Sequence, residues 1–186
     1  MLKSSMAIWS RWPLMVGLIL LAVLWRVLHQ PFNITPIGAI ALLSGSLSAG
    51  WRPHLATPFL IMFASDAVIG FHSSMWAVYS CLLLSVVVGY LIRGQRRSPL
   101  AMLTVTLACS TVFFLVTNFA VWIGTENGGI YSYSNDWNGL MTCYAAGLPF
   151  FRNAVIGDLA FMTLFYGVWG WIGVREQAAE PVADIR

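Results

Sequence analysis

Charge is what this chain of 186 residues has least of, because only 9% of its residues are Asp, Glu, Lys or Arg. Soluble domains carry roughly 25% charged residues, whereas here 59% of the residues are hydrophobic and the mean hydropathy is +0.76. This composition excludes a soluble globular domain and a disordered chain. An odd number of cysteines, without the regular spacing of a disulfide-rich domain, also excludes a fold held together by disulfides. We therefore expect an all-α integral membrane protein. At about 20 residues a span, six spans use roughly 120 residues, which leaves one compact bundle and no second domain.

Motifs for several kinds of chemistry are also absent. The ten Lys and Arg residues are too few and too scattered for a nucleic-acid surface. The sequence holds no Walker-type glycine-rich loop for a nucleotide. It also holds no Cys-x-x-Cys or His-x-x-x-His spacing for a metal ion. Any energy source for transport must therefore lie outside this chain.

Six apolar segments predict a bundle of six transmembrane helices in a single membrane domain over residues 1–174. The predicted spans are about 12–29, 34–50, 55–70, 74–92, 99–124 and 151–172. A long polar outer loop is expected over 125–148 and a charged tail over 175–186. The first apolar run follows Lys3 and Arg11 but lacks the small-x-small cleavage site of a signal peptide, so we expect it to stay as an uncleaved span.

The positions of the basic residues predict the orientation of the bundle. Eight of the ten Lys and Arg residues fall on the side of the two termini, and only Arg26 and Arg152 fall on the opposite side. Cytoplasmic loops of membrane proteins are enriched in Lys and Arg, so both termini are expected in the cytoplasm. The outer side then carries His29, His72 and the 125–148 loop.

Polar and ionisable side chains inside apolar spans are functional candidates, because a membrane makes their burial costly. Five predicted spans place such residues in their outer halves: His29, Asp66, Cys81, Asn118, Arg152, Asn153 and Asp158. We interpret them as a polar pocket that is open to the outside and closed below by an apolar plug. The alternative is that Asp66, Arg152 and Asp158 form structural ion pairs. We expect both carboxylates to be buried with partners, and Arg152 to pair with one of them or with a ligand phosphate.

Two stripes of residues at helical spacing each have two interpretations. Thr104, Thr111 and Asn118 repeat every seven residues, which is typical of hydrogen bonds between helices or back to the same helix. Asn118 also lies at the depth of the predicted pocket. Ala41, Gly45 and Ala49 repeat every four residues. This small-residue stripe favours close packing inside the bundle, with docking onto another membrane subunit as the alternative.

The predicted outer loop is rich in amide and aromatic side chains: Asn127, Tyr131, Tyr133, Asn135, Trp137, Asn138 and Tyr144. Amides offer both hydrogen-bond donors and acceptors, and aromatic rings offer flat faces. The composition therefore suits a large, flat, amide-rich ligand better than a bare ion. An aromatic belt at the membrane interface is the alternative, above all for Tyr131 and Tyr133.

Three strings of residues resemble a known family. They are NITPIG at 33–38, FLVTNF at 114–119 and GLPFFRN at 147–153. Together they resemble BtuM, a family of solitary substrate-binding S-components of energy-coupling-factor (ECF) type transporters, associated with cobalamin uptake in bacteria. The resemblance covers about residues 12–174. It implies a bacterial inner-membrane protein that binds a corrinoid at its outer face. S-components dock on a membrane subunit with two ATPases, and solitary members are thought able to work without a dedicated one.

The resemblance also implies a role for Cys81, which matches the cysteine that faces the cobalt of the corrinoid in this family. A thiolate is a soft, strongly donating ligand for a transition metal. On Co(III) it would weaken the bond to a cyanide on the opposite face, so decyanation of cyanocobalamin is the one catalytic reaction expected. Cys109 is expected to pack within the bundle, and Cys143 is the second choice as ligand or a resolving thiol. His29 is an axial ligand, a hydrogen-bond donor to the ligand or an interfacial cap.

Two other functions stay open at this point. One is an S-component for another substrate, such as a smaller vitamin or a cobalt-like ion. A carrier of bare ions should show two or more clustered His, Cys or carboxylate ligands, and the sequence has none at helical spacing. The other is a membrane scaffold without transport activity, which does not need buried Asp and Arg side chains at one depth.

Overall fold

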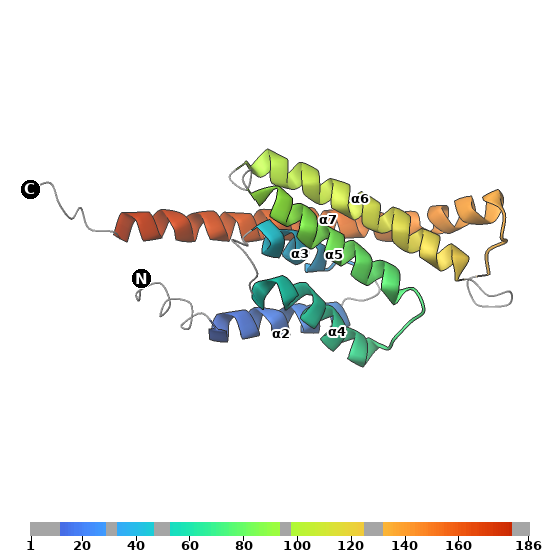
Figure 1. The fold of residues 1–186 in the computed structure, drawn as a ribbon, viewed down its shortest axis with the longest axis horizontal. Helices are drawn as coiled ribbons and strands as arrows, with labels where there is room; N and C mark the ends of the chain where they lie inside the picture. Colours follow the sequence, from blue (N-terminus) through green and yellow to red (C-terminus); the bar gives the residue numbers. More distant parts are fainter. Residues whose placement is uncertain (1–11, 29–32, 47–52, 94–97, 125–131, 180–186) are drawn as a thin grey trace, which may run out of the picture.

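The computed structural model describes residues 12–28, 33–46, 53–93, 98–124 and 132–179 (Figure 1). These residues form six α-helices and one short 3-10 helix, and no strand occurs among them. The expectation of an all-helical chain is therefore confirmed for the described residues. The elements are α2 (Trp12–Leu28), α3 (Ile37–Ser46), η2 (Pro53–Ala56), α4 (Thr57–Ile69), α5 (Met75–Leu91), α6 (Pro99–Ile123) and α7 (Trp137–Ala179).

The helices run up and down along one long axis, and α2 begins at the same end of the bundle as α7 finishes (Figure 1). We call the opposite end, where α2, α4 and α6 finish and α3, α5 and α7 begin, the distal end. The main contacts join α2 to α4, α3 to α5 and α6 to α7. The short helix α3 also contacts α4, α6 and α7, so it lies at the centre of the bundle.

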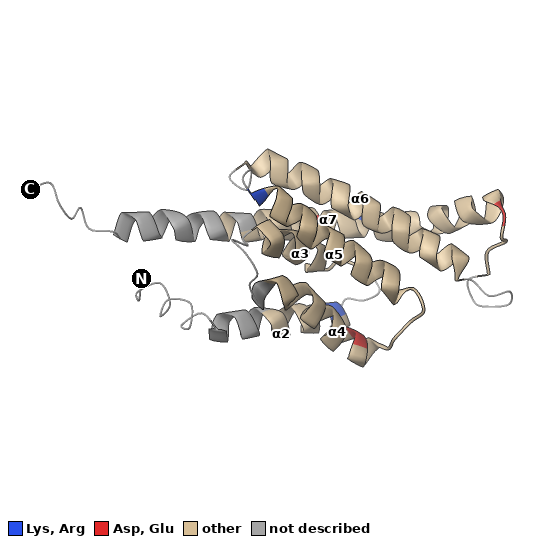
Figure 2. Cartoon of the chain, in the orientation of Figure 1, with Lys and Arg blue, Asp and Glu red and all other residues tan. Residues whose placement is uncertain are grey.

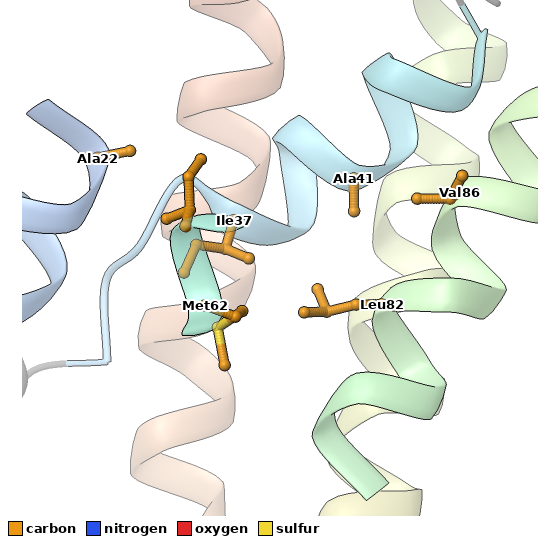
Figure 3. Close-up of a cluster of buried hydrophobic side chains, with 7 residues drawn as sticks. Ala22, Ile37, Ala41, Met62, Leu82 and Val86 are labelled. Atoms are coloured by element: carbon orange, nitrogen blue, oxygen red, sulfur yellow. The ribbon is translucent and has the colours of Figure 1, made fainter. Parts of the chain in front are cut away.

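Apolar side chains from four helices meet around α3 to form part of the core. Figure 3 shows this cluster, whose members are Ala22, Ile37, Ala41, Ile61, Met62, Leu82 and Val86. Ala41 is fully buried, and its small side chain lets α3 approach its neighbours closely. The core is therefore built around a central helix with small side chains.

The crossing of α3 and α5 depends on two glycines. A Cβ atom on Gly45 would lie 2.0 Å from the carbonyl oxygen of Val86, and one on Gly89 would lie 2.1 Å from that of Leu42. Neither site has room for a side chain, because the neighbouring atoms belong to the backbone. Internal packing is thus confirmed for Ala41 and Gly45, which leaves neither of them free to dock onto another subunit. Ala49 lies outside the described residues.

Helix lengths support membrane crossing for two segments. Helix α6 and residues Trp137–Phe165 of α7 are long and apolar enough to cross a membrane, and most of their residues lie on the surface of the bundle. The other helices are shorter. With 10 and 13 residues, α3 and α4 rise only about 15 and 20 Å, against a hydrocarbon core of about 30 Å. Among the described residues, two helices are therefore long and apolar enough to span a membrane, and the bundle of six spans stays a prediction.

The exterior of the bundle is apolar on five of the six helices. Exposed large side chains include Leu24 on α2, Leu60 on α4, Leu83 on α5, Leu115 on α6 and Leu164 on α7. Charged residues are scarce along the described helices (Figure 2). An apolar exterior of this kind is typical of a surface that contacts lipid or another protein, because exposing it to water is unfavourable.

The prediction of a loop over residues 125–148 is wrong for residues 137–148, because these residues form the first turns of α7. The carboxylate of Asp136 accepts hydrogen bonds of 2.7 Å from the backbone N–H of Gly139 and from the hydroxyl of Ser134. These bonds fix the start of the helix and hold the pKa of Asp136 below its usual range. Pro149 lies inside α7. Residues 175–179 of the predicted tail also belong to this helix.

Candidate functional site

The described helices surround a cavity of about 280 Å³, which we call the central cavity. It reaches from the distal end into the middle of the bundle. Its polar lining includes Arg26, His72, Ser85, Thr106, Ser110, Thr117 and Asp158. A second cavity of about the same volume shares Ser110, Phe113 and Thr117 with it. We call this second space the aromatic cavity, because it adds Phe114, Phe150 and Phe151 to the lining.

A buried ion pair between α2 and α4 borders the central cavity. Nη1 of Arg26 lies 2.5 Å from Oδ1 of Asp66 and donates a second hydrogen bond of 2.6 Å to Ser65. The hydroxyl of Tyr79 donates to the other carboxylate oxygen of Asp66 at 3.0 Å. The Asp66 side chain is 1% exposed. The prediction that Asp66 is buried with partners is confirmed, but Arg152 as that partner is wrong. Arg152 is exposed on α7.

Asp158 lies at the centre of the bundle and not near the start of the last helix. It is about six turns into α7, because that helix begins at Trp137. Its Oδ2 accepts a hydrogen bond of 2.7 Å from Ser110, and the backbone N–H of Ala39 also donates to the carboxylate. A Cβ on Gly38 would lie 2.5 Å from Oδ1. The first turn of α3 thus faces this carboxylate, an arrangement that stabilises negative charge.

The three cysteines are free thiols, and the structure separates their environments. Cys81 is 4% exposed and lines neither cavity. Cys109, which the sequence assigned to packing, lines the central cavity and hydrogen-bonds with Ser85. Cys143 is buried, and its Sγ contacts the carbonyl oxygen of Asn118 at 3.4 Å. In this arrangement the thiol that reaches the cavity is Cys109.

The structure does not bring the other predicted site residues together. Asn118 borders the aromatic cavity, although its amide donates to the Phe114 carbonyl of its own helix. Five further residues line neither cavity: Tyr133, Trp137, Tyr144, Arg152 and Asn153. These five side chains therefore do not contact a ligand in either cavity in this arrangement of the helices, and their role in ligand binding stays a prediction.

Their contacts explain this outcome. Trp137 is 70% exposed at the start of α7. The hydroxyl of Tyr144 donates to the Leu115 carbonyl, and its ring packs against Phe114. The contacts of Tyr144 thus hold the first turns of α7 against α6. His29, Tyr131 and Asn127 lie outside the described residues.

Most of the residues that line the central cavity were not predicted from the sequence. Thr104 and Thr111 bond back to carbonyls of their own helix, as one of the two interpretations predicted. The face of α6 that lines the cavity carries Thr106, Ser110, Phe113 and Thr117 instead. Their spacing of four, three and four residues follows one helix face, which is the signal that could have identified them.

Ligating side chains do not gather into a metal site. Among the described residues, no group of three or more His, Cys, Asp and Glu side chains could hold a metal ion.

Comparison with known proteins gives a family for the chain. Residues 6–180 match the model of a family described as a family of unknown function, DUF6580. No curated protein and no solved structure matches the chain. The match does not test the resemblance to BtuM, so cobalamin uptake stays a prediction. Since the matched residues are nearly the whole sequence, the chain belongs to the DUF6580 family.

Proposed function

We propose that this protein is a membrane-embedded solute-binding protein that takes its ligand into the central cavity from the distal end, as a step in uptake. The observation that supports this proposal most is a cavity in the middle of an apolar bundle, bordered by the buried carboxylate of Asp158 and by Arg26. Buried charges next to a cavity are costly in a membrane, so they mark a functional site. A membrane scaffold would have no use for such a cavity.

The cellular setting of this function is part of the proposal. We place the protein in the bacterial inner membrane as a multi-pass protein with both termini in the cytoplasm, so that the distal end faces outward. The sequence has no nucleotide-binding loop, so an ECF-type membrane subunit with ATPases is the proposed energy source. Such a subunit would contact a lipid-facing surface of the bundle, because Ala41 and Gly45 are covered by α5.

The size of the cavity bears on the substrate. Pockets for drug-sized ligands measure about 300–1,000 Å³, and the central cavity, at about 280 Å³, lies just below that range. A small vitamin-like molecule is the ligand that this volume favours. Binding of a corrinoid, which is larger, would require it to sit over the distal end or to move the helices apart.

Cobalamin is the second candidate, supported by the resemblance to BtuM and by two free thiols in the part of the bundle that surrounds the cavity. Cobalt ligation by Cys81 would need α5 to turn or shift, since that side chain is almost fully covered. Cys109 already lines the central cavity, so its thiol could contact a ligand there without such a movement of the helix. Decyanation of cyanocobalamin by a cysteine thiolate is the reaction that this candidate predicts.

Thermal unfolding of the full-length protein in detergent, with water-soluble vitamins and cyanocobalamin added one at a time, tests the proposal. A ligand that binds only the folded state raises the unfolding temperature. We expect at least one compound to do so, and Thr117→Phe to abolish the shift because it fills the space that joins the two cavities. Thr111→Phe, on the same helix but outside both cavities, should keep the shift. The proposal fails if no compound stabilises the protein, or if Thr117→Phe leaves the shift unchanged.

Binding of cobalamin can also be measured separately, from the visible absorption spectrum of the protein. Ligation by Cys81 predicts a thiolate-type spectrum and loss of cyanide, both of which Cys81→Ser should remove and Cys109→Ser should keep. The opposite pattern would move the ligand assignment to Cys109. A protein that stays colourless after incubation with cobalamin and removal of the free compound would reject this candidate.

A further inference from the structure

Four of the five hydroxyl side chains that line the central cavity donate their protons to other acceptors of the protein; the fifth is Thr35. Four side chains donate to backbone carbonyls four residues earlier in their own helices, at 2.7–3.0 Å: Ser85, Thr106, Ser110 and Thr117. Ser110 has two acceptors for its single proton, the Thr106 carbonyl at 2.9 Å and Oδ2 of Asp158 at 2.7 Å. A hydroxyl has one proton and two lone pairs. Toward the cavity, these oxygens can therefore only accept hydrogen bonds.

The charge balance of the cavity is negative for the same described residues. Asp158 lies deep in the bundle yet keeps accessible surface, because it borders the cavity. Arg26 cannot balance it, since its guanidinium is paired with Asp66 and Ser65. The remaining titratable groups of the lining are the His72 ring, which is hydrogen-bonded to Ser74 on the exposed distal surface, and the Cys109 thiol. One carboxylate thus faces the cavity without a cation from the protein beside it.

We infer that the central cavity binds a protonated amine. Its N–H groups donate to Asp158 and to the hydroxyl oxygens, and its apolar remainder lies toward Phe113 and the aromatic cavity. This inference names the ligand class of the proposed solute-binding function, on which it rests. Hydrogen bonds between an ammonium and a carboxylate are among the strong ones in proteins.

Other ligand classes fit the lining less well. An anion such as a phosphate would face the Asp158 carboxylate and the acceptor oxygens of Ser85, Thr106, Ser110 and Thr117, which repel it. A quaternary ammonium has the right charge but no N–H group, so the oxygens of Thr106 and Ser110 would stay unpaired on binding. A bare metal ion lacks a group of three ligating side chains among the described residues.

Three probes with the same aromatic ring test this inference on the full-length protein in detergent: phenethylamine, 2-phenylethanol and 3-phenylpropionate. They are cationic, neutral and anionic at pH 7. Isothermal titration should give phenethylamine the lowest Kd, at least about tenfold below that of the alcohol. Binding of the propionate should be weaker still. Asp158→Asn keeps the shape but removes the charge, so it should abolish the preference for the amine.

A second variant keeps the inference testable if Asp158→Asn does not fold, since that carboxylate also bonds the first turn of α3. Thr106→Val removes one acceptor from the cavity and should weaken amine binding, whereas Thr111→Val makes the same change outside the cavity and should not. The inference is overturned if the alcohol or the propionate binds as tightly as the amine, and the solute-binding function then still stands. If none of the three probes binds, the amine class is rejected. If the vitamins also fail to bind, the proposed function is rejected with it.

Discussion

Replacing Asp66 with asparagine should destabilise the folded bundle by about 3–5 kcal/mol, because it removes one partner of a buried ion pair. Arg26 keeps its charge after this change, and its side chain is only 15% exposed. Ser65 alone cannot compensate for a guanidinium that has lost its carboxylate. The unfolding temperature in detergent, followed by circular dichroism, measures the effect.

Two further variants separate the ion pair from general damage. The double variant Arg26→Met/Asp66→Leu removes both charges and should be less destabilised than either single variant. Arg93→Met should change the unfolding temperature little, since Arg93 is exposed and lies over the Tyr90 ring at 4.2 Å. Wild-type stability of Asp66→Asn would show that the pair contributes nothing to the fold.

The second large effect is expected at the crossing of α3 and α5. Gly45→Ala and Gly89→Ala each place a methyl group about 2 Å from a backbone carbonyl oxygen, so the two helices must move apart. Overpacking of this kind costs about 3 kcal/mol. We expect a large fall in the yield of folded protein and in the unfolding temperature, measured by gel filtration and thermal denaturation.

Gly167→Ala is the matched control, since nothing lies within 4 Å of a Cβ at that position on α7. This variant should be neutral or slightly stabilised, because alanine is the better helix former. Equal stability of all three alanine variants would contradict the close crossing of α3 and α5.

The helices themselves could be predicted well wherever an apolar run ended at glycine, proline or basic residues. The predicted spans 74–92 and 99–124 differ from α5 and α6 by one residue at most at either end. The start of α7 could not be predicted in this way. Its first turns carry amide and exposed aromatic side chains, and a proline follows them at 149. Composition alone indicates a loop there, whereas the cap at Asp136 and the packing of Tyr144 on α6 make it a helix.

The site was predictable only in part. Asp66 and Asp158 stood out because carboxylates are rare in this chain, and both are held by hydrogen bonds deep in the bundle. Their partners were not predictable from spacing, since the ion pair joins positions 40 residues apart and the Ser110–Asp158 bond joins positions 48 apart. The position of the first residue of the last helix also determines which of its residues lie at the same depth in the bundle as residues of the other helices. Once that start was misplaced, Arg152 and Asn153 were assigned to a pocket that they do not reach.

If the cavity bordered by Cys109 and Asp158 is a ligand site open to the distal end, a small water-soluble thiol reagent should reach Cys109 through that opening. Labelling of single cysteines measures this access. Three proteins that each keep one cysteine, Cys81, Cys109 or Cys143, are incubated with the reagent in detergent and analysed by mass spectrometry. We predict that Cys109 reacts fastest, that phenethylamine slows its reaction, and that Cys81 stays largely unmodified. Faster modification of Cys81, or a Cys109 reaction that no ligand slows, would show that this cavity is not a ligand site open to the distal end.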